Sequence, residues 1–326
     1  MSAVDSEASR ARREAARRAA RRRRRALGAL ALSAVVAVVA VLVATSGGRT
    51  RAHGVGAHAA AASAGPRAQE ESGGAGASSA SASAVGPPRS TPVPILMYHV
   101  IAAPPPGAPF PGLYVTPSEF AEQMHALSAA GWRATTLDRL AAYWRGSRRL
   151  GAGKPIVLTF DNGYQSQYTQ AFPVLRSLGW VADENIQLSG LPPSQGGLGE
   201  REVREMVAAG WELDTQGFSH ADLVALGPEQ LHYQVAVARE TLRRRYHVAV
   251  NWFCYPSGHY DATVIAAVRS AGYVGSTTVI PGWAHPSEDP YRLHRLRVLG
   301  GTSPPALEAQ IASAEGEGPA PASYGA

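Results

Sequence analysis

The chain has 326 residues, of which 45% are hydrophobic and 17% are charged, and its formal net charge is +6. Residues 1–25 hold ten Arg and three acidic residues, so this segment carries +7 and the rest of the chain −1 (6 − 7). Because the remaining chain has no excess of positive charge, we do not expect it to bind nucleic acid. The single cysteine, Cys254, excludes an intrachain disulfide, and we interpret it as a small buried apolar residue.

An apolar segment follows the Arg-rich arm, residues 1–25. Residues 26–44 are Ala, Val and Leu except for Gly28 and Ser33, and at about 1.5 Å per residue they extend ~28 Å, close to the thickness of a bilayer core. We predict a transmembrane signal-anchor at residues 26–45, with the arm in the cytoplasm and the rest of the chain outside the cell membrane. The alternative is a cleavable signal peptide and a secreted protein, because residues 43–46 include small side chains. The flanking charges argue against a buried core helix.

The composition changes twice more along the chain. Residues 46–92 are rich in Gly, Ala and Ser and contain few large apolar residues, which predicts a disordered linker. Residues 93–312 are numerous enough for one folded domain with a sizeable core. Residues 313–326 return to Ala, Gly, Pro and Glu, and we predict a flexible tail.

Within the predicted domain, short apolar runs alternate with amphipathic helical patterns. This alternation is typical of an α/β fold with a parallel sheet or barrel. We interpret Trp132, Trp144 and Trp180 as core residues. The predicted strands are 94–97, 156–160, 181–188, 212–214, 252–255 and 275–278, and the predicted helices are 118–131, 168–178, 201–209, 228–246 and 262–271.

Polar features lie close behind three of the predicted strands. They are Asp161, His220 and the turn Y-P-S-G at residues 255–258. In parallel barrels, catalytic residues gather at the carboxyl ends of the strands. We therefore expect a functional site on that rim.

The same segments resemble the polysaccharide deacetylase family (NodB homology domain, carbohydrate esterase type). The strand end T-F-D-N-G at residues 159–163 resembles the family motif T-F-D-D-G, and Q-G-F-S-H at residues 216–220 resembles H-S/T-x-x-H. Residues 94–99, 120–131, 255–261 and 290–296 resemble its opening strand, first helix, third motif and closing segment. The resemblance covers residues 93 to about 303 and implies a distorted parallel (β/α) barrel.

The resemblance also implies roles for single residues. Asp161 stands at the position of the catalytic base, and Asn162, Gln216 and His220 stand at the metal-ligand positions. In the family, a divalent metal such as zinc polarises the carbonyl and activates water, which a carboxylate and two imidazoles suit. Two positions hold neutral amides here, which are weak donors for zinc. We therefore expect metal affinity or activity to fall by at least ~10²-fold.

The closing segment contributes two further candidates. Arg295 matches the family position that pairs with the base, and His294 is a candidate general acid. We consider His99 and His259 as further residues that line the pocket.

The function implied by the resemblance is a hydrolase acting on carbon-nitrogen (non-peptide) bonds of N-acetylated polysaccharide or peptidoglycan of the cell envelope, with an atypical metal site. The alternative is a membrane-tethered glycan-binding pseudoenzyme without a metal. The retained Asp161 and His220 favour the hydrolase, whereas the two amides favour loss of standard metal-dependent activity. A barrel glycosidase would pair Asp161 with Glu212 or Asp214, at ~5–9.5 Å in one groove.

One departure from the family pattern lies in the predicted strand 181–188. Asp183 and Glu184 are adjacent carboxylates there, and unpaired burial of such groups is costly. We therefore expect them to face water, a cation or a basic partner. A shifted metal site with His220 is one interpretation, and an exposed or irregular strand is the one we favour.

Overall fold

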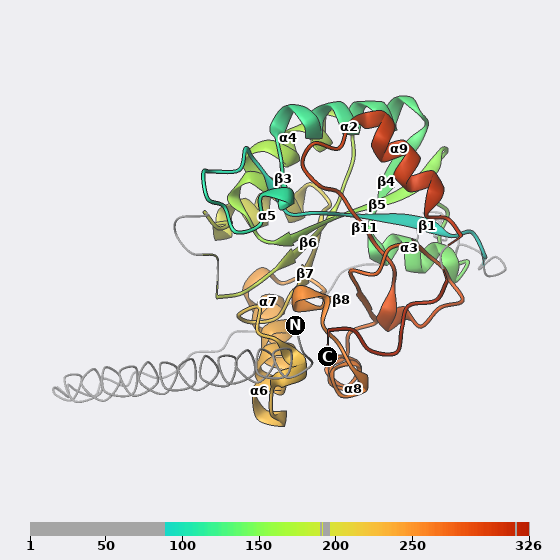
Figure 1. Cartoon of the computed structure of the whole chain (residues 1–326). Coiled ribbons are helices and arrows are strands. Elements are labelled where there is room, and N and C mark those ends of the chain that lie inside the picture. Colours follow the sequence, from blue (N-terminus) through green and yellow to red (C-terminus); the bar gives the residue numbers. More distant parts are fainter. Residues whose placement is uncertain (1–88, 190, 192–195, 317, 326) are drawn as a thin grey trace, which may run out of the picture. The chain divides into compact units, whose positions relative to one another are not determined.

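A curled, mainly parallel β-sheet with helices packed around it forms the centre of the described part of the chain (Figure 1). The computed structural model describes residues 89–189, 191, 196–316 and 318–325. The predicted arm, the predicted transmembrane segment and nearly all of the predicted linker lie outside these residues. Among the described residues, no helix has both the length and the apolar character needed to cross a membrane.

Within the described residues the main sheet has nine strands, in the order β10-β1-β5-β6-β7-β8-β9, and β4 and β11 also pair with β5 and β1. All these pairings are parallel except that of β1 with β10. The carboxyl ends of the parallel strands therefore form one rim. The strands are β1 (Val93–Tyr98), β4 (Trp132–Thr135), β5 (Lys154–Asn162), β6 (Asp183–Ile186), β7 (Glu212–Thr215), β8 (Trp252–Cys254), β9 (Gly275–Thr277), β10 (Trp283–Ala284) and β11 (Leu296–Arg297), while β2 (Val100–Ile101) and β3 (Tyr114–Val115) form a separate pair.

A short return segment, residues 293–297, links the two ends of this sheet. Leu293 bridges Thr277 of β9, and Leu296 pairs with Leu96 of β1. The curled sheet is thereby almost closed. Arg295, in the middle of the segment, is 1% exposed and lies inside the curl.

The helices cover the outside of the sheet in two groups. Apolar residues of α2, α4 and α9 join one core cluster, and those of α6, α7 and α8 join another, while α5 contributes to both. Helix α3 instead packs Leu137 and Leu140 against Ile95 and Val157. The helices are α2 (Pro117–Ala129), α3 (Leu137–Trp144), α4 (Phe172–Ser177), α5 (Glu200–Ala208), α6 (Pro228–His232), α7 (Ala238–Tyr246), α8 (Ala262–Ser270) and α9 (Pro304–Ser313).

Local sequence explains where several helices begin. Thr116 and Glu119 form a capping box at α2, and the side chains of Thr136 and Asp261 accept backbone N–H groups at the starts of α3 and α8. These caps satisfy N–H groups that have no partner inside the helix.

The predicted α/β class is confirmed as a curled parallel half-barrel with helices. Each predicted strand and helix overlaps an observed element, whereas β4, α3 and α9 were not predicted. Trp132 and Trp180 lie in the core, as expected. Part of the predicted tail contacts the domain, because Tyr324 exchanges backbone hydrogen bonds with Tyr260.

The favoured interpretation of the strand of Asp183 and Glu184, that it is exposed or irregular, is wrong. The strand is regular, and the two side chains are 0% and 2% exposed. The alternation of the strand places them on opposite faces. Neither residue has a basic partner within ion-pair distance among the described residues.

Candidate active site

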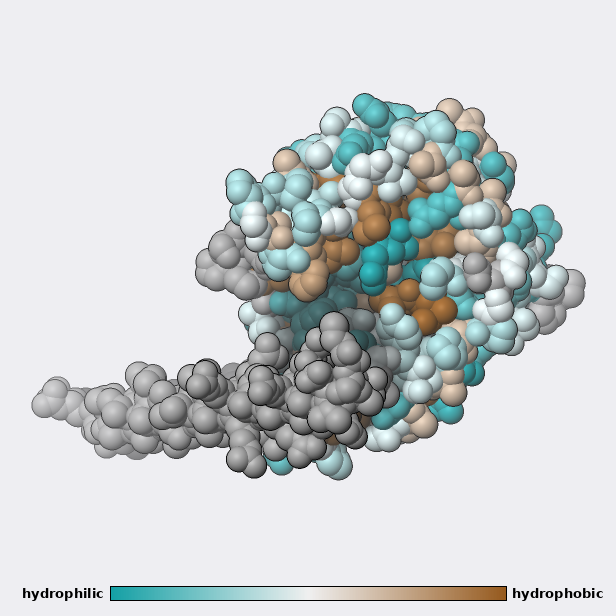
Figure 2. Space-filling model, viewed as in Figure 1, coloured by the Kyte–Doolittle hydropathy of each residue, from teal (hydrophilic) through white to brown (hydrophobic). Residues whose placement is uncertain are grey.

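A cavity of about 580 Å³ opens at the carboxyl rim of the sheet. The face drawn in Figure 2 is largely hydrophilic, and both apolar and strongly hydrophilic side chains lie across its middle. Four of the predicted catalytic and metal-binding residues come together at the cavity, and His99 joins them. The lining includes Asp161, Asn162, Gln216 and His220, together with His99, Phe110, Leu113, Tyr164, Gln187, Ser219, Tyr255, Ser257 and Arg297.

Asp161 is held by Arg295 from inside the curl. Its two carboxylate oxygens accept from Nη1 and Nη2 of Arg295 at 2.7 and 2.9 Å. Arg295 also donates to the Thr278 carbonyl at 2.7 Å and to Thr159 Oγ1 at 3.0 Å. The predicted pairing of Arg295 with Asp161 is present, in a bidentate geometry that fixes both side chains.

Further contacts surround the same carboxylate. Asn185 Nδ2 donates to Asp161 Oδ1 at 2.9 Å, and the Cys254 thiol lies 3.5 Å from Oδ2. The buried Cys254 agrees with the sequence interpretation, and burial raises the pKa of its thiol to about 12. The thiol therefore stays protonated near neutral pH.

These contacts set the charge state of the site. Burial by itself would raise the pKa of Asp161, but Arg295, followed by His99 and Asn185, holds that pKa at about 2. Such a carboxylate is ionised at neutral pH but is a weak base. Burial lowers the pKa of His99 to about 4, so its imidazole is neutral with Nε2 3.9 Å from Asp161 Oδ2.

The three candidate metal ligands line the cavity beside Asp161. Asn162 has φ 80° and His220 has φ 52°, a left-handed conformation in which Asn, Asp and His are enriched. Gln216 is 3% exposed, and its Oε1 is buried without a hydrogen-bond partner. Burial also lowers the pKa of His220, which favours the neutral imidazole that a metal requires.

This ligand set does not fit zinc. One imidazole and two neutral amides provide no negative charge, and amide oxygens are weak zinc donors. Asn162 also uses its amide nitrogen to donate to Gln187 Oε1 at 3.4 Å. We therefore assign no step of a reaction to a bound zinc ion at these residues.

Two glutamines hold the backbone of the rim. Gln167 Nε2 donates to the carbonyls of His99 and Asp161, both at 2.8 Å. Gln234 Oε1 accepts from the N–H groups of Phe218 and Ser219, both at 2.9 Å. Each glutamine belongs to a π-helical turn, Gln167–Ala171 or Tyr233–Val237, and such turns are frequent at functional sites.

The other predicted histidines lie differently. His294 Nδ1 is 2.7 Å from Glu288 Oε2, and His294 is not among the residues that line the cavity. His259 is likewise outside the lining and pairs with Asp222 at 3.1 Å. The role of His294 as a general acid therefore stays a prediction, and only His99 of the further candidates lines the cavity.

None of the alternative carboxylates reaches this cavity. Asp183 and Glu184 do not line it, so neither shares a site with His220. Glu212 and Asp214 are also absent from the lining. The shifted metal site and the paired-carboxylate glycosidase are both wrong.

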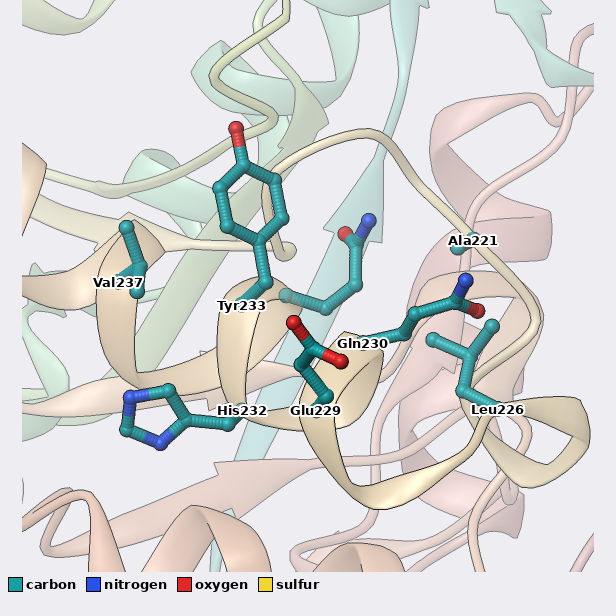
Figure 3. A pocket seen from close by; sticks show the side chains of 8 residues that line it. Ala221, Leu226, Glu229, Gln230, His232, Tyr233 and Val237 are labelled. Atoms are coloured by element: carbon teal, nitrogen blue, oxygen red, sulfur yellow. The ribbon is translucent and has the colours of Figure 1, made fainter. Parts of the chain in front are cut away.

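A second hollow of about 720 Å³ lies beside the loop of His220 (Figure 3). Its lining comes from that loop, from α6 and from the following π-helical turn, and includes Glu229, Gln230, His232 and Tyr233. Tyr233 is 44% exposed, and its ring centroid is 4.4 Å from that of Phe218. Tyr233 therefore provides an exposed aromatic ring at this second hollow.

Sequence reasoning missed three residues that build the site. Asn185 and Cys254 contact Asp161, and Gln167 holds its carbonyl. The signal available for Asn185 was the alternation of side chains along β6. The structure shows that Asn185 pairs with Asp161 in the ladder between β5 and β6. No local sequence pattern marks Gln167, which acts through a π-helical turn.

Comparison with known proteins identifies the class. Residues 149–276 match the family model for polysaccharide deacetylase. The putative polysaccharide deacetylase YxkH of Bacillus subtilis (strain 168) is 30% identical over 222 residues, covering 68% of this chain and 76% of that protein. The chain belongs to the polysaccharide deacetylase family.

Two further matches indicate what kind of relatives these are. The structure of Streptococcus pyogenes deacetylase PplD in complex with acetate matches with a TM-score of 0.62 and 25% identity, over 68% of this chain and 99% of that one. The poly-beta-1,6-N-acetyl-D-glucosamine N-deacetylase of Escherichia coli (strain K12) is 38% identical over 68 residues, 21% of this chain and 10% of that protein.

Proposed function

We propose that this protein binds an N-acetylated glycan of the cell envelope at the rim cavity and hydrolyses its carbon-nitrogen bond at least ~10²-fold more slowly than a relative with intact metal ligands. The observation that carries the proposal is the convergence of Asp161, Asn162, Gln216 and His220 on one cavity. These positions are those of the family's base and metal ligands, and two of them have lost their usual chemistry.

Exposed aromatic side chains support a glycan as the ligand. Phe110 is 68% exposed and lines the cavity, and Tyr233 adds a second ring on the adjoining hollow. Aromatic rings offer a large apolar surface to a ligand, and a few placed polar groups set its orientation. The neighbouring hollow extends the surface beyond a single sugar, as a polymer requires.

This chain's own groups support slow chemistry at most. Asp161 is ionised and aligned by Arg295, so it is available to accept a proton from water. Its low pKa limits the driving force for that transfer. The neutral His99 lies next to it.

Glycan binding without hydrolysis is the second candidate. One observation in its favour is that both oxygens of the Asp161 carboxylate already accept hydrogen bonds from Arg295 or Asn185. The other is the presence of amides at two of the metal-ligand positions. In this form the cavity retains the shape of a deacetylase site and recognises the acetamide group without cleaving it.

We also propose that residues 26–45 attach the protein to the cell membrane as a single span, with the domain outside. The support is the length of the apolar segment and the Arg-rich arm before it. Carbonate extraction of membranes from cells that express the full chain tests this. Release of the full-length chain from the membrane contradicts a spanning anchor, and a shortened chain in the medium indicates the secreted alternative.

The functional test measures binding and acetate release on the same sample. The full chain is titrated with chitooligosaccharides and peptidoglycan fragments, and acetate is assayed with and without added zinc, cobalt or nickel. We expect binding, with slow acetate release that Asp161→Asn abolishes and the exposed control Glu240→Gln does not. Binding without acetate supports the second candidate, and absence of binding to either glycan refutes both.

A further inference from the structure

Three carboxylates on β6 and β7 cluster away from the residues that line the cavity. Asp183 and Glu212 are the first residues of β6 and β7 and pair with each other in the ladder. Asp214 lies two residues after Glu212, on the same face of β7. One ligand oxygen from each residue lies within 4.8 Å of the others.

Backbone N–H groups fix the orientation of all three carboxylates. Asp183 Oδ1 and Glu212 Oε2 accept from the first two residues of α3, Leu137 and Asp138, at 3.0 and 2.9 Å. Asp214 Oδ1 accepts from the N–H of Trp252 at 2.8 Å. One oxygen of each group is thus engaged, and the orientation of the other is set.

Two of the remaining oxygens, one on Asp183 and one on Asp214, lack partners. Asp183 Oδ2 and Asp214 Oδ2 are buried and without hydrogen bonds, and the two side chains are 0% and 2% exposed. Within the described residues, no Lys, Arg or His forms an ion pair with any of the three carboxylates. Unpaired anionic oxygens at this depth require a counter-ion or protons.

An amide oxygen adds a separate observation. Asn185 is 0% exposed, and its Oδ1 is buried without a partner, while its Nδ2 is used by Asp161. Asn185 faces Asp214 across the β6–β7 ladder. An uncharged oxygen acceptor without a donor thus accompanies the carboxylates, and either a bound cation or a proton on Asp214 would supply its missing partner.

We propose that Asp183, Glu212 and Asp214 bind a divalent cation of calcium size at the amino-terminal end of the sheet. Calcium takes oxygen ligands at about 2.3–2.6 Å, so ligands on opposite sides of the ion lie up to ~5 Å apart, and the three carboxylate oxygens lie within 4.8 Å of one another. An all-oxygen, anionic site suits calcium rather than zinc. Glu212, the least buried of the three, provides the route of entry.

Such an ion ties α3 to three strands. Its ligands accept N–H groups from the start of α3 and from β8, and they stand on β6 and β7. The ion stabilises the closed end of the sheet and takes no part in the chemistry at the opposite rim. The competing explanation is a set of shared protons, because burial raises the pKa of Asp183 and of Asp214 well above its usual range.

Calcium titration of the full chain distinguishes the two explanations. After removal of metals with a chelator, the protein is titrated by calorimetry, and the melting temperature is recorded with and without calcium. We expect one equivalent to bind with a dissociation constant of ~1 mM or tighter, as in extracellular calcium sites, and the melting temperature to rise. Trp252, beside Asp214, should sensitise the luminescence of terbium used as a calcium substitute.

Variants assign the ion to this cluster. Asp214→Asn and Asp183→Asn should each weaken calcium binding at least ~10-fold and remove the rise in melting temperature, even if one of the two folds poorly. The exposed control Glu240→Gln and the cavity variant His220→Ala should bind as the wild type does. Absence of calcium binding, or binding that His220→Ala abolishes and Asp214→Asn retains, overturns the proposal.

Discussion

Removal of the Arg295 guanidinium should unbalance the buried charge of Asp161. In the folded protein the pair lowers the pKa of Asp161 from 3.8 to about 2, a difference that corresponds to about 2 kcal/mol of stability. Because the folded-state pKa is the lower one, this stability is fully present above pH ~4 and is lost as the pH falls towards 2.

Arg295→Met leaves Asp161 buried without its partner, and burial then raises the pKa of that carboxyl. Loss of one member of a buried ion pair costs about 3–5 kcal/mol, and we expect a loss of this size at pH 7. At pH 3 the carboxyl of the variant is protonated, so the difference from wild type should shrink. The double variant Asp161→Asn/Arg295→Met removes both charges and should recover part of the stability at pH 7.

Urea unfolding of the full chain at pH 3, 5 and 7 measures these differences. The midpoint and slope are followed by circular dichroism and by tryptophan fluorescence, so that a change in cooperativity is recognised. If Arg295→Met at pH 7 were as stable as the double variant, or if its loss did not change with pH, the pair would not stabilise the fold as described.

The other predictions concern the ligands, the aromatic rim and a second buried carboxyl. The double variant Asn162→Asp/Gln216→His should raise zinc affinity and acetate release by at least ~10²-fold. Addition of His220→Ala to this variant should reverse the gain. If elemental analysis finds the same metal content in the double variant as in the wild type, the assigned ligand positions are wrong. Phe110→Ala should weaken glycan binding by about tenfold in calorimetry without a change in melting temperature, and equal weakening by the exposed control Val274→Ala refutes a contact at Phe110. Both carboxyl oxygens of Glu184 are buried without partners, and burial raises the pKa of this group well above 4.5. The unfolded chain therefore loses its proton more readily than the folded one, and the wild type loses stability as the pH rises above 4.5. Glu184→Leu should therefore be more stable by about 1–3 kcal/mol at pH 8 and by less at pH 4 in urea unfolding, and a gain that does not depend on pH contradicts the burial of an unpaired carboxyl.

Hydrophobic periodicity predicts much of the order of strands and helices, because β1, β5 and β8 contain apolar runs and the outer helices each bury one face, whereas β6 and β7 hold carboxylates. The run at residues 156–160 became the centre of β5, and the pattern at residues 228–246 became α6, α7 and the π-helical turn between them. Helix α3 was not predicted, although its sequence is amphipathic and Thr136 caps its start; it packs Leu137 and Leu140 against Ile95 and Val157. Its contacts come from residues distant in sequence.

The site was predictable where family motifs mark it and not where tertiary contacts build it. Asp161, Gln216 and His220 line one cavity because parallel strands end on one rim. For Asp183, we applied the cost of burying a charge without considering the clustering of carboxyl groups, and so expected exposure. The sequence shows that a strand contains carboxylates, but only the fold shows that β6 and β7 bring three of them together.

The two π-helical turns make the rim sensitive to the number of residues in the outer helices. Gln234 reaches the loop of His220 from a turn that holds one residue more than an α-helical turn does. Deletion of one residue from that turn would rotate one part of the helix by ~100° relative to the other. Gln234 would then no longer accept the N–H groups of Phe218 and Ser219. The backbone before His220 is thus held by a side chain whose position depends on helical register outside the sheet, and a deletion there would alter the cavity while every residue that lines it stayed the same.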